Sequence, residues 1–185
     1  MLAGFACIAS RSGAPRDAEA VDYRANAALL AAAPKGHITA LDKTPHFVEA
    51  ARDQWRDDPL VATAFAPHAP YTVNDANFER VRMLSDQLDV PVHLHLHETA
   101  QEVEQSLEKH GQRPIARLDR LGLFNDRLIA IHMTQLTDAE IHLCAERGVS
   151  VVHCPESNLK LASGFCPACA LERAGVTLAV GTDGC

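Results

Sequence analysis

The feature that most constrains the fold of this sequence is a repeated alternation, from residue 58 onward, of short apolar runs with amphipathic helical patterns. Such an alternation is typical of β-α units that build a parallel sheet. The apolar runs are LVATAFA, VPVHLHL, RLIAIH, GVSVVH and GVTLAV, at residues 60–66, 90–96, 127–132, 148–153 and 175–180. The sequence therefore predicts an α/β fold with five parallel strands.

Helix-start signals lie between several of these strands. The segment 74–89 begins at Asn74, a capping residue, and carries apolar residues at helical spacing. The segments 99–111 and 137–148 each open with T-x-x-E, the capping-box pattern, and each reaches a glycine suited to a helix end. These signals predict three capped helices. Residues 1–57 are less legible, with helical patterns at 17–33 and 47–58 and a short strand at 36–42.

Polar clusters follow directly after each predicted strand and help to choose the architecture. They are PHAPY, HET, HMTQL, HCPESNLKLASG and GTDG. A (β/α)8 TIM barrel draws its site from the carboxyl ends of several strands, whereas an open doubly wound sheet concentrates its ligand at one switch point. The pattern favours the barrel. The sequence contains no G-x-G-x-x-G or G-x-x-x-x-G-K-[ST] phosphate loop, which weakens nucleotide-cofactor and NTPase functions.

Composition narrows the partners and the compartment. The chain has 185 residues, 17 Lys+Arg against 24 Asp+Glu and a formal charge of -7, so nucleic acid is a poor partner and a small molecule fits better. No apolar run approaches the ~20 residues of a membrane span, and the opening MLAGFACIAS lacks the basic start of a signal peptide. We expect a cytoplasmic protein whose six cysteines are reduced. The C-x-x-C motif CPAC at 166–169 could be half of a structural zinc site or a redox pair, but we favour ordinary loop cysteines, because no second C-x-x-C accompanies it.

The stretch PVHLHLHETA raises the question of a metal site. If a strand runs through it, His93, His95 and His97 share one face, but alternate positions lie ~6.5–7 Å apart, so one ion is not expected to take all three. A catalytic zinc needs imidazole or carboxylate ligands and an open position for water. The strand-end candidates in the whole sequence are His68, His95 or its neighbours, His132, His153 and Asp183. Their convergence predicts a metal-assisted hydrolase.

Four motifs carry a family resemblance: HLHLHET, IAIHMTQL, VVHCPESNLKLASG and GTDG, in this order on successive predicted strands. Together they resemble the later barrel strands of the amidohydrolase superfamily. Within it they are most similar to the 5'-methylthioadenosine/S-adenosylhomocysteine deaminases, relatives of the atrazine chlorohydrolase-like enzymes. The resemblance covers about residues 55 to 185 and implies strands four to eight of a (β/α)8 barrel.

The resemblance also implies roles for five residues. His95 matches a metal ligand, and Glu98 matches the substrate-binding glutamate that passes a proton to the ring nitrogen. His132 matches the catalytic histidine that touches the metal-bound water or stabilises charge. Asp183 matches a residue that is metal ligand, substrate contact and proton acceptor from the water, and His68 matches a substrate-binding histidine.

The implied activity is hydrolytic deamination of an adenine nucleoside of the methylthioadenosine or adenosylhomocysteine type, with release of ammonia. The implied cofactor is one Zn2+ per site, with Fe2+ or Mn2+ as alternatives, and homo-oligomer formation stays open. Another ring-directed amidohydrolase, such as a guanine or cytosine deaminase or a chlorotriazine hydrolase, is the neighbouring alternative. A non-catalytic fragment is the alternative from a different class.

Other polar residues near these motifs have more ordinary expectations. His93 is expected to pack in the barrel, His97 to be a supporting or rim residue, and His153 to shape the loop after its strand. Ser157, Asn158 and Lys160 either line the mouth or belong to a loop that is held by its own side-chain hydrogen bonds.

The sequence departs from the family pattern in two respects. The superfamily's first strand carries an H-x-H pair that supplies two further zinc ligands, and no such pair occurs before residue 93. A full barrel needs about 250 residues. We therefore expect an N-terminal segment of uncertain structure at 1–54 and a partial barrel at 55–185, a piece of a longer protein that is inactive in isolation.

Overall fold

A computed structural model of the chain describes residues 5–8, 37–42 and 61–183. The helices predicted at 17–33 and 47–58 lie outside these ranges. Two strands of the N-terminal part are described, β1 (Phe5–Ile8) and β2 (His37–Asp42), and β2 is the strand predicted at 36–42. The boundary between residues 54 and 55 stays a prediction.

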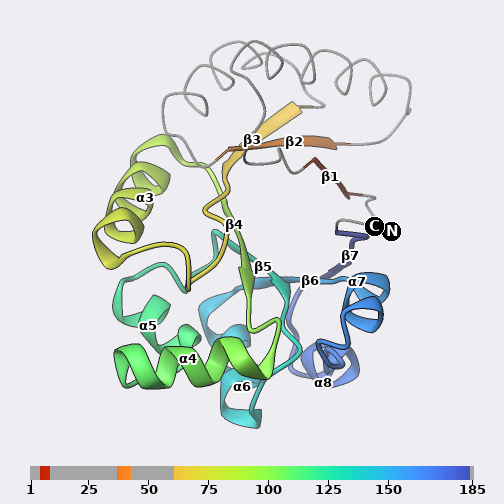
Figure 1. The fold of residues 1–185 in the computed structure, drawn as a ribbon. Coiled ribbons are helices and arrows are strands. Elements are labelled where there is room, and N and C mark those ends of the chain that lie inside the picture. The colour runs from red at the N-terminus through yellow and green to blue at the C-terminus, as the bar shows by residue number, and fades with distance from the viewer. Residues whose placement is uncertain (1–4, 9–36, 43–60, 184–185) are drawn as a thin grey trace.

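All described strands belong to one parallel sheet whose order follows the chain from β1 to β7 (Figure 1). The five strands predicted from the apolar runs are present as β3 (Val61–Phe65), β4 (Val92–Leu96), β5 (Leu128–His132), β6 (Ser150–His153) and β7 (Leu178–Val180). Among the described residues the sheet has seven strands: these five, β2 and β1, and only β1 corresponds to no predicted strand. Since every pair is parallel, the carboxyl ends of neighbouring strands lie at one edge.

The register between strands places the functional positions. β4 and β5 pair from Val92↔Leu128 through Leu96↔His132, whereas the register of β3 with β4 is Phe65↔Val92. In the first pairing His95 lies opposite Ile131, the residue before His132. The sheet hydrogen bonds therefore set His95 and His132 beside each other at the ends of adjacent strands.

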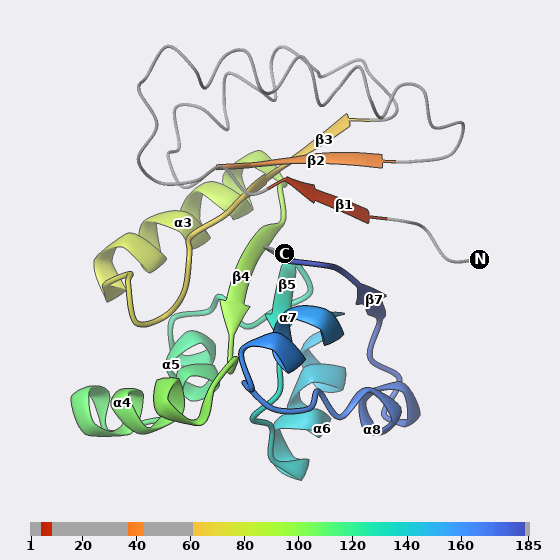
Figure 2. The ribbon, with the colours of Figure 1, turned by 45° about the vertical axis from the view of Figure 1, so that its right-hand side comes forward.

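The helices gather mainly outside β4 to β7. Figures 1 and 2 show α4, α5, α6 and α8 along one side of these strands. The helix bounds are α3 (Asp75–Leu88), α4 (Ala100–His110), α5 (Pro114–Arg120), α6 (Asp138–Arg147), α7 (Pro155–Lys160) and α8 (Ala168–Arg173). Among the described residues, none of these helices combines the length and apolar character that crossing a bilayer requires.

The three predicted caps are present, with one difference. Asn74 and Thr137 cap α3 and α6, and α6 has the complete capping box. In α4 the Thr99 side chain accepts a hydrogen bond from the Glu102 N–H, but the Glu102 carboxylate does not return to Thr99. It accepts hydrogen bonds from two other backbone N–H groups instead, so the predicted reciprocal box is only half formed in α4.

Strand β4 shows how the core forms. Val92, Leu94 and Leu96 are buried, while His93 and His95, at the alternate positions, are partly exposed. This period of two places the apolar side chains in the main hydrophobic cluster, and full burial of one leucine contributes about 1.5–3 kcal/mol. A polar substitution at Leu94 would therefore disrupt the core without touching the histidine face.

His97 does not share the face of His93 and His95, so that prediction is wrong for the third histidine. The strand ends at Leu96, and His97 has a left-handed φ of 52°. This turn redirects the His97 side chain into a fully buried position. The alternation of a strand holds only while the backbone stays extended.

Candidate metal centre

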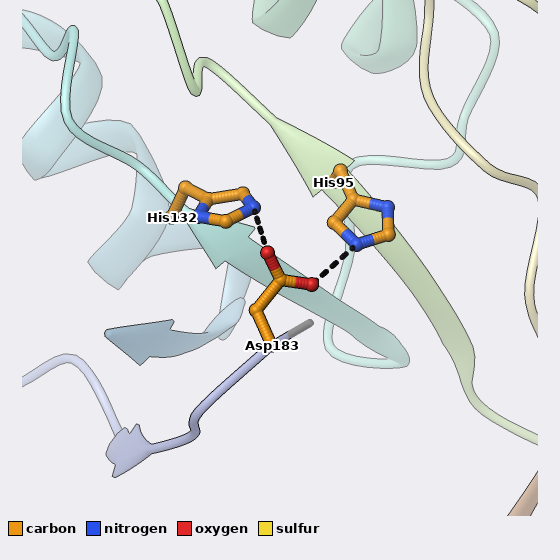
Figure 3. A group of neighbouring side chains, drawn as sticks. All are labelled: His95, His132 and Asp183. Atoms are coloured by element: carbon orange, nitrogen blue, oxygen red, sulfur yellow. Dashed lines mark ion pairs between the residues drawn. The ribbon is translucent and has the colours of Figure 1, made fainter. Parts of the chain in front are cut away.

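Three side chains from separate strand ends converge at one point. His95 is on β4, His132 ends β5, and Asp183 follows β7 (Figure 3). His95 Nε2 lies 3.6 Å from Asp183 Oδ1, and His132 Nε2 lies 3.7 Å from Asp183 Oδ2. The ligand atoms of the three residues all lie within 4.8 Å of one another. The predicted ligand pair His95 and Asp183 is therefore together, and His132 completes a triangle of donors.

The other ring nitrogens define the tautomers of the two histidines. His95 Nδ1 lies 2.8 Å from the carbonyl oxygen of His68, and His132 Nδ1 lies 2.8 Å from Asn158 Oδ1. Because these oxygens only accept hydrogen bonds, each Nδ1 carries the hydrogen in the neutral ring. Each Nε2 then presents a lone pair toward Asp183.

This arrangement fits a divalent cation. His132 Nε2 is buried and has no hydrogen-bond partner among the described residues, and two imidazole lone pairs face a carboxylate without a hydrogen between them. Electron pairs that face one another repel, and a cation among these donors would relieve the repulsion. Nitrogen ligands with one carboxylate are typical of catalytic zinc, which keeps a further position open for water.

Glu98 borders the same point. Its Oε2 lies 3.8 Å from His132 Nε2. Its backbone is held on both sides, because its N–H donates to Glu102 Oε2 at 2.8 Å and its carbonyl accepts from Thr134 Oγ1 at 2.6 Å. The predicted proton shuttle thus has a fixed backbone beside the metal centre.

Glu102 is a supporting residue that the sequence pattern did not reveal. Its buried carboxylate accepts hydrogen bonds from the N–H groups of Glu98, at 2.8 Å, and His97, at 3.2 Å. Burial raises the pKa of Glu102 to about 7, against the lowering effect of those N–H donors. The T-x-x-E spacing predicts a capping box, and it gives no sign that the Glu102 carboxylate binds the N–H groups of His97 and Glu98.

His68 lies on the exposed side of the centre. Its ring is 5.3 Å from the His95 ring and 5.6 Å from the Tyr71 ring, and its carbonyl holds His95. Burial raises the pKa of Tyr71, and the carboxylates of Glu98 and Glu102 raise it further. His68, the predicted substrate-binding histidine, therefore borders the centre together with Tyr71, whose pKa the carboxylates of Glu98 and Glu102 raise.

Three other histidines near these strands, His93, His97 and His153, have lowered pKa values. His97 donates from Nδ1 to the Gln135 carbonyl and accepts from the Ile115 N–H at Nε2, so both nitrogens are used. Burial lowers the pKa of His97 and of His93 to about 4. Burial and the nearby His132 also lower the pKa of His153. These rings favour the neutral state.

The CPAC cysteines do not join the centre. Cys166 is buried and Cys169 is exposed, both are free thiols, and burial raises the pKa of Cys166 to about 11. Neither belongs to a group of metal-ligating side chains among the described residues. Cys166 precedes α8, and Cys169 lies within that helix.

Two residues of α7 contact the centre directly. Ser157 Oγ donates to Asp183 Oδ2 at 2.7 Å, and Asn158 Oδ1 accepts from His132. The sequence left open whether these residues line the mouth or bond within their own loop. Both bond to side chains at two other strand ends, so the alternative of bonds confined to their own loop does not describe them.

The chain belongs to the amidohydrolase family, whose model matches residues 9–185. Among curated proteins, the 5-methylthioadenosine/S-adenosylhomocysteine deaminase of Teredinibacter turnerae is 50% identical over 133 residues, which cover 72% of this chain and 30% of the relative. The protein of the same name from Nitratidesulfovibrio vulgaris strain DP4 is 51% identical over 137 residues, with coverage of 74% and 31%. The chain thus spans about a third of these relatives.

Two solved structures are similar to this chain. An adenosine deaminase from Xanthomonas campestris with bound zinc is 65% identical, with a TM-score of 0.79 and coverage of 91% of this chain and 40% of that protein. The zinc complex of atrazine chlorohydrolase from Arthrobacter aurescens TC1 is 21% identical, with a TM-score of 0.74 and coverage of 88% and 40%. The second likeness supports the fold alone.

Proposed function

We propose that this chain supplies the later strands and most of the catalytic groups of a metal-dependent hydrolase that deaminates an adenine nucleoside of the methylthioadenosine or adenosylhomocysteine type. The observation that carries the proposal is the convergence of His95, His132 and Asp183 beside Glu98. The deaminase relatives support the substrate class.

The proposed architecture is part of a (β/α)8 barrel in which β3 to β7 are barrel strands four to eight. Strictly sequential parallel order is the order that a barrel requires. The site residues also lie at the carboxyl ends of the strands, where barrel enzymes assemble their sites.

The residues divide the proposed chemistry between them. His95 and Asp183 would hold a zinc ion, which supplies an activated water when it is bound. Asp183 accepts the proton of the attacking water, and His132 orients that water. Glu98 passes a proton to the ring nitrogen next to the carbon that bears the amine and regains one from the new hydroxyl group. Asp183 passes its proton to the amine, which leaves as ammonia. His68, from the exposed side, contacts the nucleoside.

The ligand set is smaller than the family pattern. Because the sequence has no H-x-H before residue 93, two expected ligands are missing. We therefore expect the 185-residue chain to bind zinc weakly and to turn over little substrate by itself. Zinc held tightly in a one-to-one ratio by this chain would contradict that expectation.

The test joins the chain to an upstream segment that carries the family's H-x-H pair and measures ammonia release from 5'-methylthioadenosine, S-adenosylhomocysteine, guanine, cytosine and a chlorotriazine. We expect zinc-dependent deamination of the two adenine nucleosides. The matched control is Asp183→Asn in the same chimaera, which should abolish turnover. A well-folded, zinc-loaded chimaera that does not deaminate the adenine ring would overturn the proposal.

A further inference from the structure

Helix α7 places two neighbouring polar side chains against the metal centre. Ser157 and Asn158 are 3% and 2% exposed, respectively, although both are polar. Ser157 donates to Asp183, and Asn158 accepts from His132. We propose that this pair positions the centre: Asn158 sets the tautomer of His132, and Ser157 sets the orientation of the Asp183 carboxylate. The catalytic consequence rests on the proposed function.

Asn158 matters because a neutral imidazole carries one hydrogen. Asp183 Oδ2 and Glu98 Oε2 lie 3.7 Å and 3.8 Å from His132 Nε2, and both carboxylates attract a hydrogen to that nitrogen. Asn158 Oδ1, at 2.8 Å from Nδ1 in a buried setting, draws the hydrogen to the opposite side of the ring. Its hydrogen bond therefore keeps the lone pair of Nε2 directed into the site.

The tautomer distinguishes between the two roles that a histidine at this position could have. With its lone pair at Nε2, neutral His132 accepts a hydrogen bond from the attacking water and does not donate one to a developing negative charge. Ser157 complements this by occupying one lone pair of Asp183 Oδ2, while Oδ1 faces His95 at 3.6 Å. The pair thus orients one proton acceptor from each of two strand ends.

His95 provides an internal reference. Its Nδ1 hydrogen is held by the main-chain carbonyl of His68 at 2.8 Å, which no side-chain substitution removes. A change at Asn158 should therefore alter the tautomer of His132 and leave that of His95 unchanged. A general disturbance of the fold would alter both.

The experiment uses the 185-residue chain labelled with 15N-histidine, freed of metal by a chelator and held at about pH 8, above the ordinary imidazole pKa of about 6.5. Long-range 1H–15N spectra report which nitrogen carries the hydrogen. We expect Nδ1–H for both His95 and His132. In Asn158→Leu, His132 should shift toward Nε2–H, while Asn158→Asp, which keeps the acceptor, should retain Nδ1–H.

The exposed Glu156 of the same helix provides the control, because Glu156→Gln should leave both tautomers unchanged. An Nε2–H tautomer for His132 in the unaltered chain would overturn the proposal. An unchanged tautomer in Asn158→Leu, with the His95 signal intact, would also overturn it.

Zinc titration by calorimetry gives a second readout that does not depend on turnover. Loss of a group that orients a metal ligand typically lowers metal affinity about 10- to 100-fold. We expect a loss in that range for Ser157→Ala, because Ser157 holds the proposed zinc ligand Asp183. Asn158→Leu should cause a smaller loss, because Asn158 holds His132, which is not one of the two proposed ligands. Equal zinc affinity in Ser157→Ala and the unaltered chain would overturn the positioning role of Ser157. Correct tautomers in the 185-residue chain, together with a zinc-loaded chimaera that does not deaminate the adenine nucleosides, would overturn the proposed function alone.

Discussion

Helices α4 and α6 begin with the same T-x-x-E pattern but use its glutamate differently. In α6, Glu140 closes the capping box by accepting from the Thr137 N–H at 2.9 Å, and it also binds Arg113 through two oxygens. In α4, Glu102 accepts from the N–H groups of His97 and Glu98. In α6 the glutamate stabilises its own helix start. In α4 the glutamate instead binds the loop that carries Glu98, the proposed proton shuttle.

The difference teaches that a local signature specifies a helix start but not the full set of hydrogen bonds. The left-handed turn at His97 leaves backbone N–H groups in a buried loop, and buried donors need acceptors. Glu102 meets this need. Burial also raises the pKa of Glu140, but its hydrogen bonds from Arg113 and Thr137 outweigh burial and lower that pKa overall. The two carboxyl groups therefore have opposite pKa shifts.

The largest expected effect is that of Glu102→Ala. This substitution leaves two buried N–H groups without acceptors, and we expect the free energy of unfolding to fall by about 2–4 kcal/mol. Urea unfolding measures the loss, and hydrogen exchange should accelerate at the His97 and Glu98 amides. The exposed Glu104 of the same helix supplies the control, Glu104→Ala. A loss no greater than that of the control would contradict the role of Glu102.

Glu140→Ala should have a somewhat smaller effect, because its partner Arg113 is 30% exposed and can be hydrated when the carboxylate is removed. We expect a loss of about 1–3 kcal/mol in urea unfolding. Hydrogen exchange should accelerate at the Thr137 amide and stay unchanged at Glu98. Faster exchange at Glu98 in this variant would remove the proposed distinction between the two helices.

The pH dependence of stability should have opposite signs at the two glutamates. The pKa of Glu102 rises from 4.5 to about 7, so the folded chain binds more protons than the unfolded chain in this interval. The contribution of that shift is complete below pH 4.5 and is lost as the pH rises toward 7. The lowered pKa of Glu140 has the reverse effect: its contribution is complete above pH 4.5 and is lost as the pH falls below it.

Urea unfolding across this pH range checks the signs. The stability difference between the unaltered chain and Glu102→Gln should change in favour of the variant as the pH rises from 4.5 to 7. The corresponding difference for Glu140→Gln should change in favour of the variant as the pH falls below 4.5. If the two stability differences changed with pH in the same direction, Glu102 and Glu140 would not have opposite pKa shifts.

The smallest effects are expected at the cap threonines. Thr99→Ala and Thr137→Ala should each lower the free energy of unfolding by about 1 kcal/mol, the usual effect of losing an N-cap. Thr137→Ala should cost a few tenths of a kcal/mol more, about the value of one weak contact, because its hydroxyl also contacts Glu140 at 3.0 Å. Thermal unfolding resolves the pair, and a larger loss at Thr99 would reverse the comparison.

Much of the fold follows from neighbours along the chain. The alternation of Val92, His93, Leu94, His95 and Leu96 specifies a strand with one apolar face, and β4 has that form. The caps at Asn74 and Thr137 are likewise local. The convergence of His95, His132 and Asp183 could also be expected, because parallel strands bring their carboxyl ends to one edge.

The sequence by itself determined the strand-helix order, the helix starts and the strand-end placement of the chemical groups, because each depends on periodicity or on residues a few positions apart. Only the tertiary structure decided that His97 turns into the core and that Glu102 serves the Glu98 loop. It also decided that Asn158, 26 residues from His132, holds that ring. The Glu102 bonds depend on the left-handed backbone at His97, and the Asn158 bond joins two separate elements, so neither periodicity nor a capping pattern encodes them.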